Sequence, residues 1–349
     1  MKREELIRLF SQLGRLFNQL ANDESWKDYE SGLTEDEYIA VKTVVNKQFI
    51  YNGWFTKESV QFSLLHWSAV LNEKSLKEWT SQYSFSSSPK GIAIIMAGNI
   101  PLVGFHDFLT AILSGNKALC KYSSDDKTML PAFIDILIKW NPEFAKYACD
   151  LTGKKAEIEG VIATGSDNSS KFFEQYFGKY PHVFRRNRTS VAVLTGKESH
   201  EQMHELGMDI FTYFGLGCRN VSLLFVPKGY EVAHFFEGMF DHKDIIYHKK
   251  YGNNYDYNKA IFLMNKHKLF DNNFVLLRES DDLFSPLAMV HFKEYETMSE
   301  VEEYIKQNEN KIQAIVGENH VPFGVSQKPD LMHYADNVDT FAWLNTLQK

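Results

Sequence analysis

The sequence predicts an α/β protein of two lobes, the first of them built on a doubly wound parallel sheet. Its 349 residues exceed the size of one ordinary domain, which is about 100 to 200 residues. Continuous apolar runs such as residues 92–97 alternate with amphipathic segments such as 128–140, and the alternation starts again near residue 190. Buried strands that alternate with helices are typical of a parallel sheet covered on both faces.

The elements of the first lobe follow from the spacing of apolar residues. Leucine and phenylalanine recur at helical spacing over residues 1–20, so we expect an amphipathic helix there and mostly helical structure to about residue 80. A serine-rich stretch at 84–91 predicts a loop. After it we expect strands at 92–97, 118–122 and 160–163, and helices at 101–114, 128–140 and 168–177.

The second lobe repeats the pattern less regularly. We expect its strands at 190–194, 221–226, 274–277 and 287–292. Residues 241–259, rich in His, Lys, Tyr and Asn, are predicted to be an exposed loop region. The predicted segments are therefore a first lobe at 1–190, a second lobe at 191–319, and a C-terminal segment at 320–349 that either returns to the first lobe or makes an oligomer contact.

Composition argues against several classes of protein. The net charge of −7 predicts no general attraction to nucleic acid or to an anionic membrane. No apolar run is long enough for a signal peptide or a membrane span, so we expect a cytoplasmic protein. Three cysteines without a Cys-x-x-Cys pair argue against a disulfide framework and a zinc cluster, and no metal is expected. The 27 phenylalanines suit a large core better than an apolar channel.

Cys218 is the candidate nucleophile. It lies between a glycine-punctuated turn at 213–217 and the apolar run 221–226. The thiolate is the reactive form, and a free cysteine with a pKa of about 8.5 is only slightly ionised at neutral pH, so its position must activate it. The alternative is a buried cysteine that acts as a small hydrophobe. Cys120 and Cys149 have weaker cases.

Three loops of the first lobe follow the ends of predicted strands. They are residues 98–101 (Gly-Asn-Ile-Pro), 121–124 (Lys-Tyr-Ser-Ser) and 164–166 (Thr-Gly-Ser). Ligands of doubly wound sheets bind outside the carboxyl ends of the strands. We therefore expect the three loops to face one ligand crevice.

These loops, Gly217-Cys218 and residues 282–286 (Asp-Leu-Phe-Ser-Pro) occur in the order and coarse spacing of the aldehyde dehydrogenase superfamily. The chain resembles its acyl-CoA reductase branch, the LuxC-type fatty-acyl-CoA reductases, from about residue 91 onward, including 323–329. The resemblance implies an aldehyde dehydrogenase-like fold, with a Rossmann-type nucleotide-binding first lobe and a second, catalytic α/β lobe. It also implies NAD(P)H-dependent reduction of an acyl-CoA.

Asn99 matches the catalytic asparagine of the superfamily, whose amide donates a hydrogen bond to the oxygen that becomes negative when the cysteine attacks. With the backbone N–H of Cys218 it would complete an oxyanion hole, and loss of one such donor costs about 100- to 1000-fold in rate. The alternative for Asn99 is an ordinary turn asparagine.

The resemblance also gives residues for a dinucleotide. Lys121, followed by Ser123, matches the lysine that contacts the adenosine ribose or its 2′-phosphate, and Ser124 stands where many NAD-preferring relatives have Glu. A 2′-phosphate is then admissible, so NADPH is the expected cofactor and NADH the alternative, although Asp125 and Asp126 weaken this inference.

Two further motifs match parts of the same cofactor site. Gly165 and Ser166 match the Gly-Ser that binds the pyrophosphate at a helix N-terminus, or else form an ordinary helix cap. Asp282 and Phe284 stand in the family's Glu-x-Phe-Gly-Pro motif, whose carboxylate holds the nicotinamide ribose, with the shorter Asp in place of Glu.

A carboxylate is missing upstream of the cysteine. Hydrolytic aldehyde dehydrogenases carry a Glu there as the base for water, whereas residues 175–197 contain no Asp or Glu. Slow hydrolysis would favour reduction of an acyl-CoA over release of a free acid. Arg185, Arg186 and Arg188 in this stretch could contact phosphates or form a solvated basic loop, and they are left unassigned.

The sequence therefore predicts an NAD(P)H-dependent acyl-CoA reductase that forms a thioester on Cys218, releases CoA and yields an aldehyde. A medium- or long-chain acyl group would suit the resemblance. Reduction of another activated acyl group, such as an acyl phosphate, stays open, as does a non-catalytic nucleotide-binding protein of the same fold. By resemblance we also expect a homo-oligomer, with 321–349 as the first segment to inspect.

Overall fold

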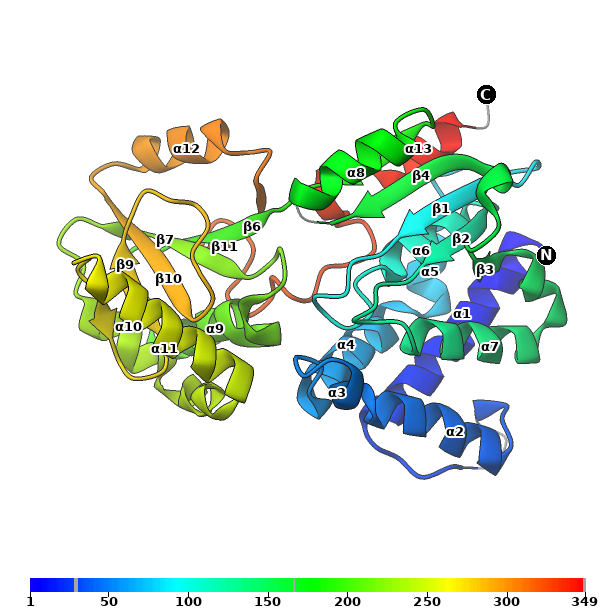
Figure 1. The fold of residues 1–349 in the computed structure, drawn as a ribbon, viewed down its shortest axis with the longest axis horizontal. Coiled ribbons are helices and arrows are strands. Elements are labelled where there is room, and N and C mark those ends of the chain that lie inside the picture. The colour runs from blue at the N-terminus through cyan, green and yellow to red at the C-terminus, as the bar shows by residue number, and fades with distance from the viewer. Residues whose placement is uncertain (28–30, 166, 348–349) are drawn as a thin grey trace. The chain divides into compact units, whose positions relative to one another are not determined.

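The computed structural model describes residues 1–27, 31–165 and 167–347 and shows two compact units, each with its own parallel sheet (Figure 1). Unit 1 comprises residues 1–186 together with 330–349, and unit 2 comprises 187–329. The last part of the chain thus belongs to unit 1. Among the described residues, every helix is too short or too polar to cross a bilayer.

Unit 1 contains a sheet of five parallel strands in the order β3-β2-β1-β4-β5. This is the strand order of a doubly wound nucleotide-binding fold, as predicted. The sequence did not predict β3 and β5, which are short edge strands with partly exposed side chains. The bounds are β1 (Gly91–Ile95), β2 (Lys117–Lys121), β3 (Ala148–Asp150), β4 (Ile158–Thr164) and β5 (His182–Arg185).

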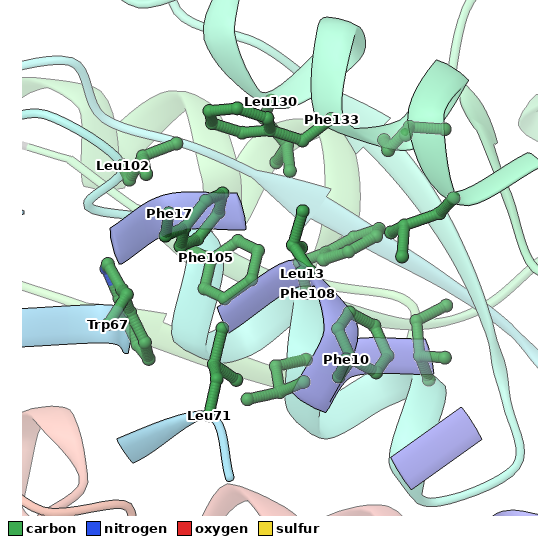
Figure 2. Close-up of a cluster of buried hydrophobic side chains, with 14 of the residues drawn as sticks. Phe10, Leu13, Phe17, Trp67, Leu71, Leu102, Phe105, Phe108, Leu130 and Phe133 are labelled. Atoms are coloured by element: carbon green, nitrogen blue, oxygen red, sulfur yellow. The ribbon is translucent and has the colours of Figure 1, made fainter. Parts of the chain in front are cut away.

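The helices of unit 1 pack around an aromatic core (Figure 2). Phe17 of α1 packs on Phe133 of α7 with ring centroids 4.6 Å apart, and Phe10 lies 6.4 Å from Phe105 of α6. All four side chains are fully buried, so these phenylalanines serve the core. The bounds are α1 (Arg3–Ala21), α2 (Glu35–Asn46), α3 (Gln48–Tyr51), α4 (Lys57–Val70), α5 (Glu73–Thr80), α6 (Phe105–Leu113), α7 (Met129–Trp140), η2 (Pro142–Lys146), η3 (Lys155–Glu157), α8 (Asp167–Phe177), η6 (Ala335–Asn337) and α13 (Thr340–Thr346).

Unit 2 contains a six-stranded sheet in the order β11-β6-β7-β10-β9-β8. Its strands are parallel except β8, which pairs antiparallel with β9. The predicted α/β character of the second lobe is therefore confirmed. The bounds are β6 (Thr189–Val193), α9 (His200–Phe211), η4 (Thr212–Gly215), β7 (Val221–Pro227), α10 (Val232–Met239), η5 (Phe240–Tyr247), α11 (Lys249–Met264), β8 (Phe270–Asp271), β9 (Leu276–Glu279), β10 (Met289–Tyr295), α12 (Met298–Gln307) and β11 (Ile312–Gly317).

The prediction of a loop region at 241–259 is wrong, because this segment forms η5 and most of α11. His248 caps α11 by accepting a hydrogen bond from the backbone N–H of Tyr251. Tyr251, Tyr255 and Asn258 then line the buried face of the helix at helical spacing. Tyrosine and asparagine carry little hydropathy signal, which hid the helical period in the sequence.

Arg185 forms a buried ion pair in unit 1. Its Nη2 lies 2.6 Å from Oδ1 of Asp107 on α6 and 2.8 Å from Oγ1 of Thr340 on α13. Arg185 and Asp107 are only 3% and 4% exposed. Burial raises the pKa of Asp107, and the guanidinium of Arg185 opposes that rise. Neither role left open for Arg185, phosphate contact or solvated loop, fits this position.

Loss of this arginine should destabilise unit 1. Arg185→Met leaves the Asp107 carboxylate buried without its cation, which typically costs about 3 to 5 kcal/mol of unfolding free energy. The exposed neighbour offers a matched control, since Arg186→Met should change stability by less than about 0.5 kcal/mol. Urea denaturation compares the two variants. Equal stability of the two would contradict the structural role of the pair.

Candidate active site

Three loops of unit 1 lie at one edge of its sheet. The strands β1, β2 and β4 are parallel, so the segments that follow their carboxyl ends, residues 96–104, 122–128 and 165, gather there. Gly98 packs directly on the second of these loops, because a Cβ at Gly98 would lie 2.5 Å from Oγ of Ser123 and 3.0 Å from Cβ of Asp125. Within unit 1 the structure thus brings the predicted Asn99 and Lys121 motifs together.

Buried polar contacts fix the backbone around Asn99. Asn52 Nδ2 donates to the carbonyl of Gly98 at 3.3 Å, and Ser63 Oγ donates to the carbonyl of Pro101 at 3.0 Å. Leu102 adopts a left-handed backbone with φ of 58°, unusual for a leucine. The Asn99 side chain is exposed on this rigid loop. Such pre-organisation is what an oxyanion donor requires.

Asp126 links the two loops. Its Oδ2 accepts a hydrogen bond of 2.9 Å from the backbone N–H of Leu102. The side chain is nearly buried, and this burial raises its pKa to about 6, against the opposing effect of the Leu102 hydrogen bond. Lys121, Ser124 and Asp125 are exposed. Of the two aspartates that weakened the inference for NADPH, only Asp125 therefore presents its carboxylate to solvent.

Gly165 follows β4 at the start of α8. A Cβ there would lie 2.8 Å from Cβ of Ser169 and 3.0 Å from the ring of Phe173, so only glycine allows the helix to pack this close to the strand. Its backbone N–H donates to the carbonyl of Arg185 at 3.5 Å. The predicted pyrophosphate ligand Ser166 lies outside the described residues.

Cys218 precedes the amino end of β7 in unit 2 and is half-buried. All three cysteines lie in the described part of the chain, and none forms a disulfide. Burial raises the pKa of Cys120 to about 12 and also raises that of Cys149. Both environments disfavour a thiolate, so Cys218 keeps the best case for a nucleophile.

The chain reaches Cys218 through a strained turn. Tyr213, Phe214 and Gly215 all have left-handed backbones, with φ of 55°, 60° and 81°. A residue other than glycine pays about 1 to 2 kcal/mol for this conformation. Strain of this kind persists only where the surroundings impose it, and it is common near functional sites.

Asn220 holds this turn in place. Its Nδ2 donates to the carbonyls of Asp209, Ile210 and Thr212 at 3.1, 3.1 and 2.8 Å. Its Oδ1 accepts from the backbone N–H of Gly217 at 2.8 Å. One buried side chain therefore joins the end of α9 to the residue before the cysteine. No role is predicted for Asn220 from the sequence, although an asparagine two residues after a candidate nucleophile in a glycine-rich turn is a usable signal.

Hydroxyl groups at the amino ends of β6 and β7 extend the network. Ser190 Oγ donates to the carbonyl of Cys218 at 3.1 Å. Thr189 Oγ1 donates to Ser222 Oγ at 2.8 Å, and Ser222 Oγ donates to the carbonyl of Leu283 at 2.7 Å. The turn of Cys218 and the 282–286 segment are thus tied to the same end of two adjacent strands. Unit 2 brings these two predicted motifs together.

The side chains of the 282–286 segment are accessible. The Asp282 side chain is 74% exposed; its Oδ2 accepts from Ser280 Oγ at 3.1 Å and lies 3.7 Å from Nη1 of Arg278. Phe284 is 38% exposed, whereas Leu283 is buried. Asp282 and Phe284 can therefore meet a ligand, while Leu283 anchors the segment.

No base for water emerges from the fold of unit 2 near the carboxylate-free stretch. Glu198, the first carboxylate after it, is buried and accepts hydrogen bonds from the backbone N–H groups of Thr195 and Gly196 at 2.5 and 3.0 Å. This loop follows the carboxyl end of β6, whereas Cys218 precedes the amino end of the parallel neighbour β7.

Arg188 donates to the carbonyls of Glu309 and Ile312 within the same unit.

A family model described as "Acyl-CoA reductase (LuxC)" matches residues 6–317. None of the curated proteins matches the sequence.

Solved aldehyde dehydrogenases share the fold. Lactaldehyde dehydrogenase from Escherichia coli aligns with 90% of this chain and 74% of its own, with a TM-score of 0.60 and 12% identity. The NAD+ complex of an aldehyde dehydrogenase from Bacillus cereus aligns with 90% of this chain and 72% of its own, with a TM-score of 0.62 and 12% identity. A structure described only as an E. coli NADP dependent enzyme also aligns, with 90% of this chain and 73% of its own covered, a TM-score of 0.64 and 10% identity. The predicted aldehyde dehydrogenase-like fold is therefore confirmed.

Removal of the Asn220 amide should loosen the cysteine turn. Asn220→Ala leaves several buried carbonyls without a donor, which should lower the free energy of unfolding by about 1 to 3 kcal/mol. It should also change the rate at which iodoacetamide alkylates Cys218, with Cys149 in the same sample as the internal reference. Peptide mass spectrometry measures both rates. A variant with unchanged stability and an unchanged ratio of rates would show that Asn220 does not hold the turn.

Asp126 should make stability depend on pH. Its pKa is raised to about 6 from 3.8, so the folded chain binds this proton more tightly than the unfolded chain. The resulting stabilisation is fully present below the unfolded pKa and is lost as the pH rises through the folded one. Relative to Asp126→Asn, the free energy of unfolding should therefore fall by about 1 to 3 kcal/mol between about pH 4 and pH 7. Urea titrations test this, and a constant difference would refute it.

Proposed function

The chain belongs to the acyl-CoA reductase (LuxC) family, and on this premise we propose that it reduces acyl-CoA to aldehyde through a thioester on Cys218. The family match confirms the resemblance seen in the motifs and makes the protein an oxidoreductase that acts on acyl and aldehyde groups. The observation that carries the covalent step is the turn before β7, where the Asn220 clamp holds a left-handed backbone ahead of the half-buried Cys218, at the strand end to which Ser222 also ties the 282–286 segment.

The proposed reaction begins at the Cys218 sulfur. The thiolate adds to the thioester carbonyl, the bond to the CoA sulfur breaks, and CoA leaves as a thiolate. A reduced nicotinamide dinucleotide supplies the hydride that converts the acyl group to the aldehyde level. The bond from Cys218 to the hemithioacetal carbon then breaks, which releases the aldehyde and regenerates the thiolate.

Asn99 and the Cys218 backbone N–H are proposed to stabilise the oxyanion in both halves of the reaction. The fixed backbone around Asn99 supports this role, because a donor held in place needs no reorganisation as charge develops. Asn99 thus acts on the substrate oxygen, whereas Asn220 is a positioning residue that acts through the turn.

For the cofactor we propose NADPH. Lys121, Ser123 and Ser124 would hold the adenosine ribose and its 2′-phosphate, since Lys121 and Ser124 are exposed and the nearby Asp126 is committed to Leu102. The glycine that packs α8 onto β4 suits a pyrophosphate at that helix N-terminus, with Ser166 as the further ligand expected there. Asp282 and Phe284 would contact the nicotinamide ribose.

The fate of the acyl group follows from the missing base. The stretch 175–197 contains no carboxylate, and the buried Glu198 caps its own loop. The carboxylate that hydrolytic relatives use as a base for water is therefore missing from this stretch, and this favours reduction over hydrolysis.

Product analysis tests the proposal. With a medium- or long-chain acyl-CoA and NADPH, the wild type should form aldehyde and CoA in equal amounts and little free acid, whereas Cys218→Ala should form none. Cys149→Ala is the matched control and should keep the activity. Parallel assays with NADH and with an acyl phosphate measure the two alternatives. Aldehyde formation by Cys218→Ala, or a strong preference for the acyl phosphate, would contradict the proposal.

A further inference from the structure

Helix α11 carries apolar side chains on its outward face. Tyr257, Ile261 and Met264 recur at helical spacing and are 64%, 37% and 79% exposed. A neighbouring side of the helix buries Tyr251 and Tyr255 against unit 2. The helix lies at the outside of its unit, where none of the described residues covers the outward face (Figure 1). The outward face is thus apolar without belonging to the core.

Lysines surround this apolar face. Lys250 lies on the same side of the helix, seven residues before Tyr257, and Lys266 follows the C-terminal end; both are exposed. Between residues 240 and 271 the chain carries six lysines and four aspartates, with Lys259 paired to Asp271 at 2.5 Å, although the overall net charge of the chain is −7. We call Lys250, Tyr257, Ile261, Met264 and Lys266 the α11 face.

The segment before α11 has the same character. Phe240 and Tyr247 of η5 are 56% and 80% exposed, and Lys243 Nζ lies 4.1 Å from the centroid of the Phe240 ring. Segments that bind in the plane of a membrane surface use apolar and aromatic side chains for insertion and lysines for the lipid phosphates. Tyrosine suits the headgroup level, because its ring is apolar and its hydroxyl is polar.

The charge of the α11 face favours an anionic membrane over a second copy of the chain as its binding partner. In a symmetric contact with a second copy, each lysine-flanked patch would meet another patch of the same sign. An anionic bilayer offers both the opposite charge and an apolar layer beneath it. The negative charge of the whole chain argues against general adsorption to such a surface, so contact would be confined to this patch.

We propose that the α11 face docks on the surface of an anionic lipid bilayer, with Tyr257, Ile261 and Met264 inserted at the headgroup boundary and the lysines facing lipid phosphates. The proposal goes beyond the catalytic assignment and does not depend on it.

Vesicle flotation of the full chain tests the proposal. The probes are vesicles of phosphatidylcholine alone and vesicles in which about a third of the lipid is phosphatidylglycerol. The wild type should float with the anionic vesicles at low salt, not with the neutral ones, and should be released at about 0.5 M salt because screening weakens the attraction. The double variant Ile261→Glu with Met264→Glu should lower the bound fraction at least about fivefold.

A matched control uses exposed apolar residues of unit 1. Ile39 and Ile50 are 51% and 74% exposed, and Ile39 lies on α2, whose first turn is acidic. Ile39→Glu with Ile50→Glu adds the same charge and should leave flotation unchanged. Circular dichroism and thermal melting confirm that both variants fold.

Three results would overturn the proposal. The wild type fails to float with anionic vesicles at low salt, or the α11 variant floats as well as the control. The third result comes from light scattering without vesicles: the wild type forms an oligomer and the α11 variant does not. That result would assign the α11 face to contact with a second copy of the chain.

Discussion

The hydrogen bonds of one buried amide constrain the most important turn of this protein. Asn220 ties the carbonyls that end α9 to the backbone N–H of Gly217, and the chain between them accepts three successive left-handed residues. Nothing intrinsic to a tyrosine or a phenylalanine favours this backbone, so the clamp and the packing of Phe214 on His248 must hold it. The position of Cys218 is therefore a consequence of α9, of β7 and of the amide that joins them.

Each unit presents its candidate residues at one end of a parallel sheet. Unit 1 gathers its loops at the carboxyl ends of its strands, as doubly wound sheets do. Unit 2 places Cys218 and the 282–286 segment at the amino ends of β6 and β7. Burial takes one carboxylate of each unit out of solvent: Asp126 beside the loops of unit 1, and Glu198 at the carboxyl end of β6, the end of the sheet opposite to Cys218.

Much of the fold could be predicted from local sequence because the centres of β1, β2, β4 and β7 are apolar and buried. The ion pair of Arg185 could not, since its partner Asp107 lies 78 residues away and three neighbouring arginines resemble a solvated loop. Helix α11 was missed because its buried residues are tyrosines and an asparagine. The site residues were predicted from motifs and remain predictions. The hydrogen bonds of Asn220 could not be predicted, because they depend on which backbone groups the fold brings to its side chain.

The central claim is that Cys218 carries the acyl group between CoA and hydride, and the intact mass of the protein tests it most directly. After mixing with acyl-CoA and no reductant, the wild type should gain the mass of one acyl group on Cys218, and addition of NADPH should remove that mass as aldehyde appears. The claim is contradicted if no adduct forms across a range of acyl chains, or if an adduct forms equally on Cys218→Ala.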